Sequence, residues 1–591
     1  MKRNRFRASR ILLRLRRIVR NDQLILSVLA LVVGVVGGGA VIVFREGIDL
    51  IQGLAFGSDS KELFFHARNL PWWHLLLIPT LGGFLVGLLV HLLMPGGRPH
   101  GVSDVIEASA LRAGRMSART GMSAALISAV SIGAGASVGR EGPAIHLVAS
   151  IGSSISRKLH LTRSLTRTLL GCGVAAAVAG SFNAPIAGAL FAGEVVIGHY
   201  ALKSFAPVVM ASVAGTAVSR SYFGDFPAFL ISEHNIASFW ELLSFSGLGV
   251  VAGIVAIIFL RAIIVADNAS QRIPAPVYIR TTVGGLIVGL IAIAFPHVLG
   301  VGYGVNDAAL AVSFSLGLLI AVAIMKIIAT AVSIGFGFGG GVFSPSLVIG
   351  ATIGGAYGVL VGQMLPGFTS DPAAYSLVGM GAITAAVLGA PLSTTLIIFE
   401  MTGDYALTLA VMVAVVISSV IAQQFHGRTV FSWQLENRGL NLSEGLETAL
   451  LQALTVAGVM SQESERAMPS TGLQNLRGLL QNSTHGRVFV VQETGELVGT
   501  VTLAGMSEVA FDHGVDDLIC AGDVADLHPP VLARSEDLEA TLKMMRDTGE
   551  EHIAVVEDLE SMKFLGCVHE RDVMSAYNTV LLESRREERG D

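Results

Sequence analysis

Apolar residues form long runs between about residues 24 and 435, and polar residues are confined to short intervals between them. About 20 apolar residues suffice for a helix that crosses the hydrocarbon core of a bilayer. The pattern therefore predicts membrane-spanning helices at 24–44, 74–94, 121–138, 245–265, 281–295, 309–334 and 406–422. Short or glycine-interrupted runs predict half-helices that end inside the membrane, at 144–156, 169–180 and 345–362.

The pattern changes after about Glu436, where the composition becomes that of a soluble domain. Two strand–turn–strand patterns follow, each preceded by a helical pattern at 471–482 or 535–548. Their strands are expected at 487–491, 495–501, 552–556 and 564–568. The fold class predicted is an all-α polytopic membrane protein with a small α/β domain at its C-terminal end. The expected boundaries are 1–23 for an N-terminal segment, 24–435 for the membrane domain, 436–450 for a linker and 451–591 for the α/β domain.

Composition and charge agree with this division. Of the 591 residues, 52% are hydrophobic and only 14% are charged, which excludes an ordinary soluble protein. Residues 2–20 are basic without an acidic residue, so we expect the N-terminus on the cytoplasmic side of the inner (plasma) membrane. The apolar run from Leu24 lacks a convincing cleavage site and is interpreted as a retained span. We expect the lipid bilayer, and no nucleic acid, as a partner.

The three cysteines, Cys172, Cys520 and Cys567, are far apart in the sequence. Their odd number and wide spacing exclude a disulfide framework and a CxxC metal site. No metal or tightly bound cofactor is expected.

The stretch from Gly133 to Pro143 carries the first candidate chemistry, with Arg140, Glu141 and Gly142 near its end. Pro143 suits the first turn of a helix, and the glycines allow backbone amides to turn toward a ligand. A helix start of this kind favours an anion. A carboxylate at Glu141 competes with that anion for the same amides, so we interpret Glu141 as a gate. The alternative is a packing turn held by an Arg140–Glu141 ion pair.

Two motif matches lie in this glycine-rich chain. Gly135 to Gly139 fits the G-x-S-x-G pattern of hydrolases around Ser137, and residues 335–340 fit G-x-G-x-x-G. Neither lies between a soluble strand and a helix, and no base or metal ligand accompanies Ser137. We therefore do not expect an enzyme.

An internal duplication is predicted from two matched pairs of motifs. An Ala-Pro pair precedes Glu194 in one half and Glu400 in the other, with the Glu ten residues after the Ala each time. Pro143 and Pro345 are each followed nine residues later by glycine. Inverted halves of this kind bring equivalent broken helices together near the membrane midplane. Residues 339–345 would then direct their amides at the same point as 139–143.

Three ionisable residues lie in apolar surroundings: Glu194, Glu400 and Lys326. A charge inside a membrane is costly unless it is paired. We expect each to be bound by backbone or by a charged neighbour, in a structural role.

These residues resemble the CLC family of chloride channels and proton/chloride exchangers over about residues 24–435. The resemblance rests on residues 139–143, on the Gly-Gly-x-Phe-x-Pro run from Gly340 and on Glu400 to Tyr405. It implies a dimer of inverted-repeat subunits, each with its own anion path. Glu141 would be the protonatable gate of a chloride path. Arg140 and Gly142 of its loop, with the backbone amides of Val342 and Phe343, would contact the anion.

The chain departs from the family pattern at three positions. His100, beside Gly101, stands where the family usually has an anion-binding serine, and Phe431 stands where it usually has an anion-binding tyrosine. Exchangers usually carry an inner proton-relaying glutamate at the position of Val195. Valine at position 195 favours a channel over a proton/chloride antiporter, which remains the alternative, and the departures at His100 and Phe431 leave the preferred anion open. A membrane-anchored nucleotide sensor is a third possibility.

The C-terminal modules resemble a tandem pair of CBS domains, which many members of this family carry on the cytoplasmic side. Asp572 is in the position of a ribose-contacting aspartate, whereas the first module has Gly505 there. The resemblance implies that an adenine nucleotide binds, with an aspartate contact to its ribose in no more than one of the two modules. A pair that only stabilises the dimer is the alternative.

Overall fold

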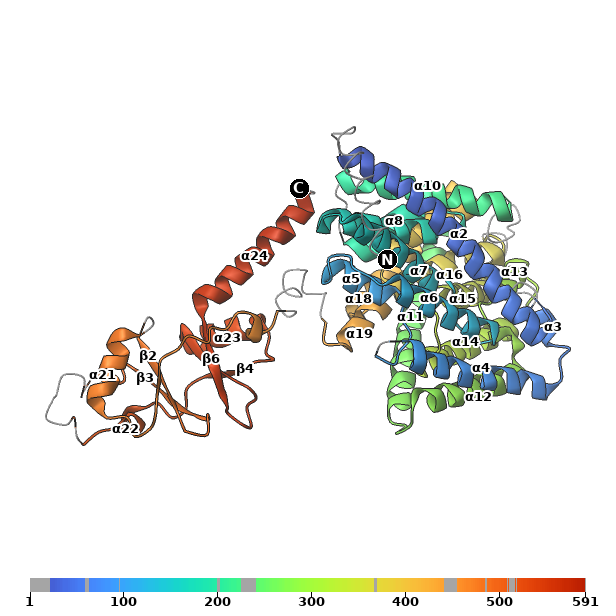
Figure 1. The fold of residues 1–591 in the computed structure, drawn as a ribbon. Coiled ribbons are helices and arrows are strands. Elements are labelled where there is room, and N and C mark those ends of the chain that lie inside the picture. Colours follow the sequence, from blue (N-terminus) through green and yellow to red (C-terminus); the bar gives the residue numbers. More distant parts are fainter. Residues whose placement is uncertain are drawn as a thin grey trace. The chain divides into compact units, whose positions relative to one another are not determined.

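The computed structural model describes residues 22–58, 63–94, 96–198, 202–224, 241–365, 369–440, 454–483, 486–507, 509, 516 and 518–589. The basic segment expected at 1–23 and the linker expected at 436–450 lie largely outside these residues. The chain divides after Asn437 into two units (Figure 1), which we describe separately.

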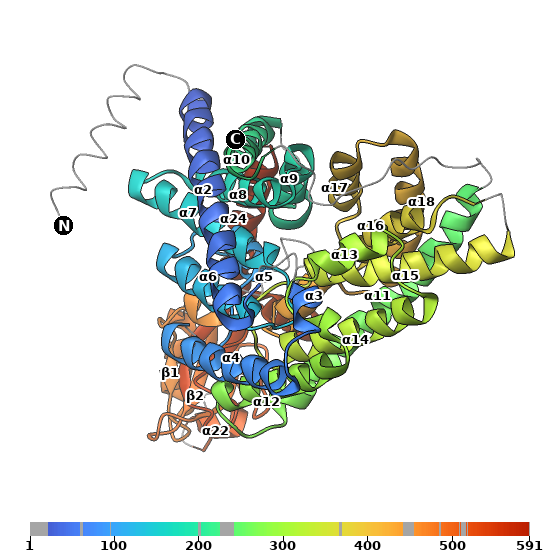
Figure 2. The same ribbon diagram turned by 90° about the vertical axis from the view of Figure 1, so that its right-hand side faces the viewer.

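The first unit is built from helices (Figures 1 and 2). Its first half contains α2 (Asp22–Phe56), α3 (Leu63–Ala67), α4 (Trp72–Leu93), α5 (Val102–Ala110), α6 (Ala118–Gly133), α7 (Glu141–Leu159), α8 (Arg163–Phe182), α9 (Pro185–Phe191), the π-helical segment η1 (Ala192–Ile197) and α10 (Leu202–Phe223). Its second half contains α11 (Glu241–Gln271), α12 (Val277–Ala294), η2 (Pro296–Val298), α13 (Tyr303–Leu310), α14 (Leu316–Gly335), α15 (Phe343–Met364), α16 (Pro372–Leu388), α17 (Pro391–Thr402), α18 (Tyr405–Phe425) and α19 (Val430–Glu436).

Eight helical stretches within the described residues are long and apolar enough to cross a membrane. They are Gln23–Phe56, Trp72–Leu93, Arg163–Phe182, Glu241–Gln271, Val277–Ala294, Leu316–Gly335, Phe343–Met364 and Tyr405–Glu436. The polytopic membrane fold predicted from the sequence is therefore confirmed.

Two of the predicted spans have the wrong bounds. The run 121–138 was expected to cross the membrane, but α6 ends at Gly133 and has 16 residues. The chain turns there because Gly135 takes a φ of +89°, a conformation that favours glycine. In the run 309–334 the helix begins only at Leu316, after a break that follows Leu310.

The runs at 169–180 and 345–362 belong to longer elements than the predicted half-helices, because α8 and α15 are continuous helices of 20 and 22 residues. The glycines of α15 are packing positions. A Cβ atom at Gly350 would lie 2.5 Å from the carbonyl oxygen of Gly379, and one at Gly354 would lie 2.1 Å from that of Tyr375. Small residues thus let α15 and α16 approach backbone to backbone, as is common in membrane helices.

The internal duplication is visible in matched contacts of α6 and α14. Ser131 Oγ accepts a hydrogen bond from Gly339 N at 3.0 Å, and Ser333 Oγ accepts one from Ser137 N at 3.1 Å. Each helix thus binds the turn that follows the other helix. The same element order continues through α7–α9 and α15–α17.

The second unit contains two similar modules (Figure 1). The first has β1 (Arg466–Ala467), α21 (Leu473–Asn482), β2 (Arg487–Val491) and β3 (Leu497–Thr502), whereas the preceding η3 (Val456–Gly458) packs with the second module. After α22 (Ala521–Val524), the second has β4 (Val531–Ala533), α23 (Leu538–Thr548), β5 (His552–Val556), β6 (Phe564–His569) and α24 (Glu570–Arg589). These bounds agree with the two predicted strand–turn–strand patterns and their helices.

Each module forms a three-stranded sheet, in the orders β1-β2-β3 and β4-β5-β6. In both sheets the first pair of strands is parallel and the second is antiparallel. A shared cluster of buried apolar side chains joins the two sheets, and it includes Phe489, Leu497, Val556 and Phe564. The α/β tandem domain predicted from the sequence is confirmed.

Candidate functional site

The turns that precede α7 and α15 lie against each other in the first unit. Gly139 N donates to Gly341 O at 2.6 Å, and Gly341 N donates to Gly139 O at 2.8 Å. This bridge is antiparallel, so the two turns run in opposite directions, as inverted halves require. Two helix starts far apart in sequence therefore meet, and the first-turn amides of each lack a partner inside their own helix.

The glycines of these turns permit the close approach. A Cβ atom at Gly340 would lie 2.3 Å from Cγ2 of Val138, and one at Gly139 would lie 3.1 Å from Ser344 N. A larger residue at either position would push the two helix starts apart.

A third helix start reaches the same place. Gly101 precedes α5, and its N–H donates to Asp104 Oδ2 at 2.8 Å. Cγ2 of Val102, the first residue of α5, lies 3.7 Å from where a Cβ atom of Gly142 would be. The three starts together concentrate positive helix-dipole ends around one point, which favours an anion there.

The Glu141 carboxylate lies at this junction and is only 1% exposed. Its Oε1 accepts hydrogen bonds from Tyr303 Oη at 2.9 Å and from Ser344 Oγ at 2.6 Å. Its Oε2 is buried without a hydrogen-bond partner among the described residues and lies 2.8 Å from where a Cβ atom of Gly139 would be. The carboxylate is therefore held on one oxygen while the other faces the joined turns.

Arg140 lies beside this carboxylate and is also buried. Its Nε is 4.0 Å from Glu141 Oε1, and its guanidinium carbon is 4.5 Å from the centroid of the Tyr303 ring. Arg140 and Arg45 also line one pocket, together with Val41, Phe44, Ala144, Gly180 and Ser181. Arg140 thus lies beside the carboxylate, and Arg45 adds a second cation at the neighbouring pocket, which makes the surroundings favourable for an anion.

His100 lies at the approach to α5. Its Nδ1 is 3.8 Å from Asp104 Oδ1, and its ring makes an edge contact with the ring of His146 at 5.6 Å between centroids. Asp104 is also bound by Arg98 Nη2 at 2.7 Å. His100 therefore belongs to a polar cluster at the start of α5 and contacts α7 through His146.

The remaining residues singled out by the family resemblance lie on the elements around the junction. Val342 immediately precedes α15, and Phe343 begins that helix and packs its ring 4.7 Å from the ring of Phe182. Phe431, in α19, and Val195, in η1, are partly buried side chains that pack against the apolar core. Both α19 and η1 contact α5.

The two half-buried glutamates of the Ala-Pro motifs each bind backbone amides of the opposite half. Glu194 accepts hydrogen bonds from Leu392 N at 3.0 Å and Ser393 N at 2.8 Å, at the start of α17. Glu400 accepts from Ile186 N at 2.9 Å and Ala187 N at 2.7 Å, at the start of α9. The predicted structural role is confirmed for this pair.

Lys326 and Ser137 also have structural partners. Lys326 Nζ donates to Val298 O and to Gly300 O, each at 3.0 Å, as the sequence predicted for a bound lysine. Ser137 Oγ lies 2.9 Å from Thr330 Oγ1, so the match to a hydrolase motif corresponds to a packing contact between the halves.

Sequence reasoning missed the two donors to Glu141. Ser344 lies inside the Gly-Gly-x-Phe-x-Pro run from Gly340 to Pro345. Its position next to the first helical residue could have indicated a hydroxyl donor at this helix start. Tyr303 stands between two glycines as the first residue of α13, where no motif distinguishes it.

Asp572, the residue expected to contact a nucleotide, is in the first turn of α24 and is partly exposed. Its Oδ1 is 3.6 Å from Nε of Arg571.

Two family models match the chain. The one described as voltage gated chloride channel matches residues 82–423, and the one described as CBS domain matches residues 521–579. A chloride channel protein described as ClcB-like, from Ralstonia nicotianae, is 37% identical over 404 residues, which cover 68% of this chain and 94% of that protein. A voltage-gated ClC-type chloride channel, ClcB, from Salmonella typhi is 31% identical over 407 residues, which cover 68% of this chain and 97% of that protein.

Solved structures show the same fold. A slow cyanobacterial Cl⁻/H⁺ antiporter matches with a TM-score of 0.63 at 23% identity, over 70% of this chain and 97% of that chain. A eukaryotic CLC transporter matches with a TM-score of 0.61 at 21% identity, over 93% of this chain and 97% of that chain. A CLC-type fluoride/proton antiporter matches with a TM-score of 0.57 at 21% identity, over 68% of this chain and 95% of that chain.

Proposed function

Because the chain belongs to the CLC family of chloride channels and transporters, we propose that it is an anion channel gated by protonation of Glu141. Chloride or a similar small anion is the proposed cargo. Members of this family are channels or transporters rather than enzymes, and the multi-pass membrane fold fits this role.

The observation that carries the proposal is the double hydrogen bond between Gly139 and Gly341. It holds the amides that open α7 and α15 within reach of one point, beside the start of α5. An anion that enters there loses water and gains N–H donors. The amides of Gly142, Val342 and Phe343 are the proposed donors, with Gly101, His100 and Phe431 around them.

Glu141 supplies the gate in this proposal. The ionised carboxylate is an anion itself and occupies the place that the transported anion needs. Protonation removes its negative charge, which weakens its attraction to the helix starts and lets the side chain leave. Anion flux should then rise as the pH falls.

The channel is favoured over an exchanger by Val195, whose side chain cannot carry a proton. Proton/chloride antiport remains a second candidate, since two of the similar structures are described as proton-coupled antiporters. A proton could reach Glu141 only through water near Val195 in that case.

Reversal potentials separate the two functions. Purified protein in planar bilayers is exposed to a fixed chloride gradient, with and without a proton gradient. A channel gives the same reversal potential in both conditions, whereas a coupled antiporter shifts it with the proton gradient. Replacing chloride by fluoride, nitrate or bromide in the same experiment ranks the anions.

We further propose a homodimer in the inner membrane with cytoplasmic CBS modules. An adenine nucleotide is proposed to bind beside Asp572. Thermal unfolding of the full chain with ATP, ADP or AMP tests this: binding raises the unfolding temperature of the wild type, and Asp572→Ala abolishes the rise.

A further inference from the structure

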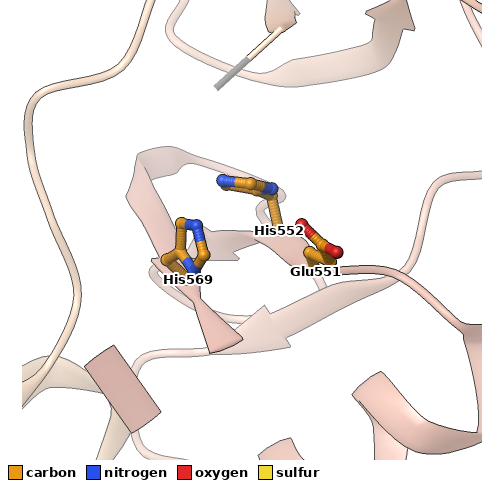
Figure 3. Close-up of side chains that lie close together, drawn as sticks. All are labelled: Glu551, His552 and His569. Carbon is orange, nitrogen blue, oxygen red and sulfur yellow. The ribbon is translucent and has the colours of Figure 1, made fainter. Parts of the chain in front are cut away.

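A pair of histidines faces a glutamate at one end of the second CBS module. His552 begins β5, His569 ends β6, and Glu551 immediately precedes β5. One possible ligand atom from each of the three residues lies within 4.8 Å of the other two. Figure 3 shows the two rings and the carboxylate gathered around a common space. We propose that Glu551, His552 and His569 bind one divalent transition-metal ion such as Zn²⁺.

The ligand chemistry fits such an ion. Two imidazole nitrogens and a carboxylate oxygen are a ligand set that Zn²⁺ uses when a fourth position stays open. Zn–N and Zn–O bonds of about 2.0–2.2 Å place tetrahedral ligand atoms about 3.4 Å apart. Side-chain shifts of about 1 Å would bring the three atoms to that spacing.

The backbone around the three residues is fixed. His552 and His569 are directly paired in the antiparallel ladder of β5 and β6, and their rings are 4.1 Å apart between centroids at 71°. Arg487 Nη1 donates to His552 O at 2.8 Å, and Glu570 N donates to Glu551 O at 2.9 Å. Rotation of the side chains alone can therefore complete the site.

Burial gives the proposed site one open side. His552 is 8% exposed, His569 is intermediate and Glu551 is exposed. An ion could enter from solvent beside Glu551 and reach the buried imidazole of His552.

The first module supplies an internal comparison. Its ladder places Arg487 opposite Thr502, where the second module has His552 opposite His569. The hairpin therefore does not need two histidines in order to form, and neither arginine nor threonine would bind a metal there. Only the second module carries the proposed ligands.

A metal bound at Nδ1 of His569 would replace an existing contact. His569 Nδ1 accepts a hydrogen bond from Arg571 N at 2.8 Å, at the start of α24. A metal at this nitrogen would displace that amide. In the first module Thr502 Oγ1 accepts the equivalent kind of bond from Gly505 N at 3.1 Å. His569→Thr should therefore preserve the start of α24 while removing a metal ligand.

The test measures Zn²⁺ bound to the tag-free full-length protein in detergent. After equilibrium dialysis against buffered Zn²⁺, elemental analysis should find about one ion per wild-type chain, with a rise in unfolding temperature. His569→Thr and Glu551→Gln should each weaken Zn²⁺ binding by at least roughly tenfold. His528→Ala, an exposed histidine of the same unit, is the matched control and should bind as the wild type does.

Circular dichroism of His569→Thr verifies that the variant is folded. The proposal is overturned if the wild type binds no Zn²⁺ at micromolar free concentration. It is also overturned if folded His569→Thr binds Zn²⁺ with wild-type affinity and stoichiometry, because the ion then lies elsewhere.

Discussion

The hydroxyl of Tyr303 donates a hydrogen bond to the Glu141 carboxylate at 2.9 Å. The two residues are far apart in sequence, and the bond joins the start of α13 to the start of α7. Ser344 adds a second donor to the same oxygen from α15. The Glu141 carboxylate is thus held in place by two hydroxyl donors from the second half of the unit.

Tyr303→Phe should loosen this gate. A hydrogen bond to a charged group contributes about 1.5–3 kcal/mol. Its loss would shift the balance toward the open position by about ten- to hundredfold. We expect a higher chloride efflux rate than that of the wild type at the same pH. Chloride efflux from liposomes measures this.

Tyr405→Phe is the control for that experiment, since Tyr405 is 72% exposed and lies in α18. It should leave efflux unchanged. A Tyr303→Phe protein with wild-type efflux near neutral pH would show that the hydroxyl does not restrain Glu141.

Gly354→Ala should destabilise the first unit. The added Cβ atom would lie 2.1 Å from Tyr375 O, and backbone atoms of α16 cannot move aside cheaply. Overpacking of this kind costs about 1–3 kcal/mol. Gly47→Ala, in a helix with open space around the site, should change stability by no more than about 1 kcal/mol. Unfolding temperatures in detergent compare the two; equal values would contradict tight α15–α16 packing.

Glu194→Ala should weaken the start of α17. Leu392 N and Ser393 N would lose their common acceptor, and removal of a helix cap costs about 0.5–2 kcal/mol. Glu194→Gln keeps one acceptor oxygen and should lose less. Glu400→Ala should produce a loss similar to that of Glu194→Ala, because Glu400 makes the equivalent contacts with α9. Thermal unfolding would contradict the reciprocal arrangement if only one of the two alanine variants were destabilised.

Much of the membrane fold is predictable from local patterns. The apolar runs indicate the spans, and the matched Ala-Pro and Gly-Pro motifs indicate the two halves. Glycine is ambiguous, however: it permits the turn at Gly135, whereas at Gly354 it permits two continuous helices to touch. A single sequence does not distinguish these uses, because the neighbouring helix decides between them.

Contacts between distant segments are the part that the sequence does not reveal. The need of Glu194 and Glu400 for partners follows from the cost of a buried charge, but the choice of backbone amides in the opposite half does not. Tyr303 and the pairing of His552 with His569 likewise depend on which segments the fold brings together. Val195, His100 and Phe431 gain their interpretation only from the family resemblance.

The central claim is that Glu141 competes with the transported anion at the joined helix starts. Its most direct test is chloride efflux from liposomes, measured over a pH series for the wild type and for Glu141→Gln. The account predicts that wild-type efflux rises as the pH falls, because protonation releases the side chain. It predicts that Glu141→Gln, which cannot ionise, conducts at every pH with little pH dependence. An unchanged pH profile in Glu141→Gln would contradict the assignment of the gate.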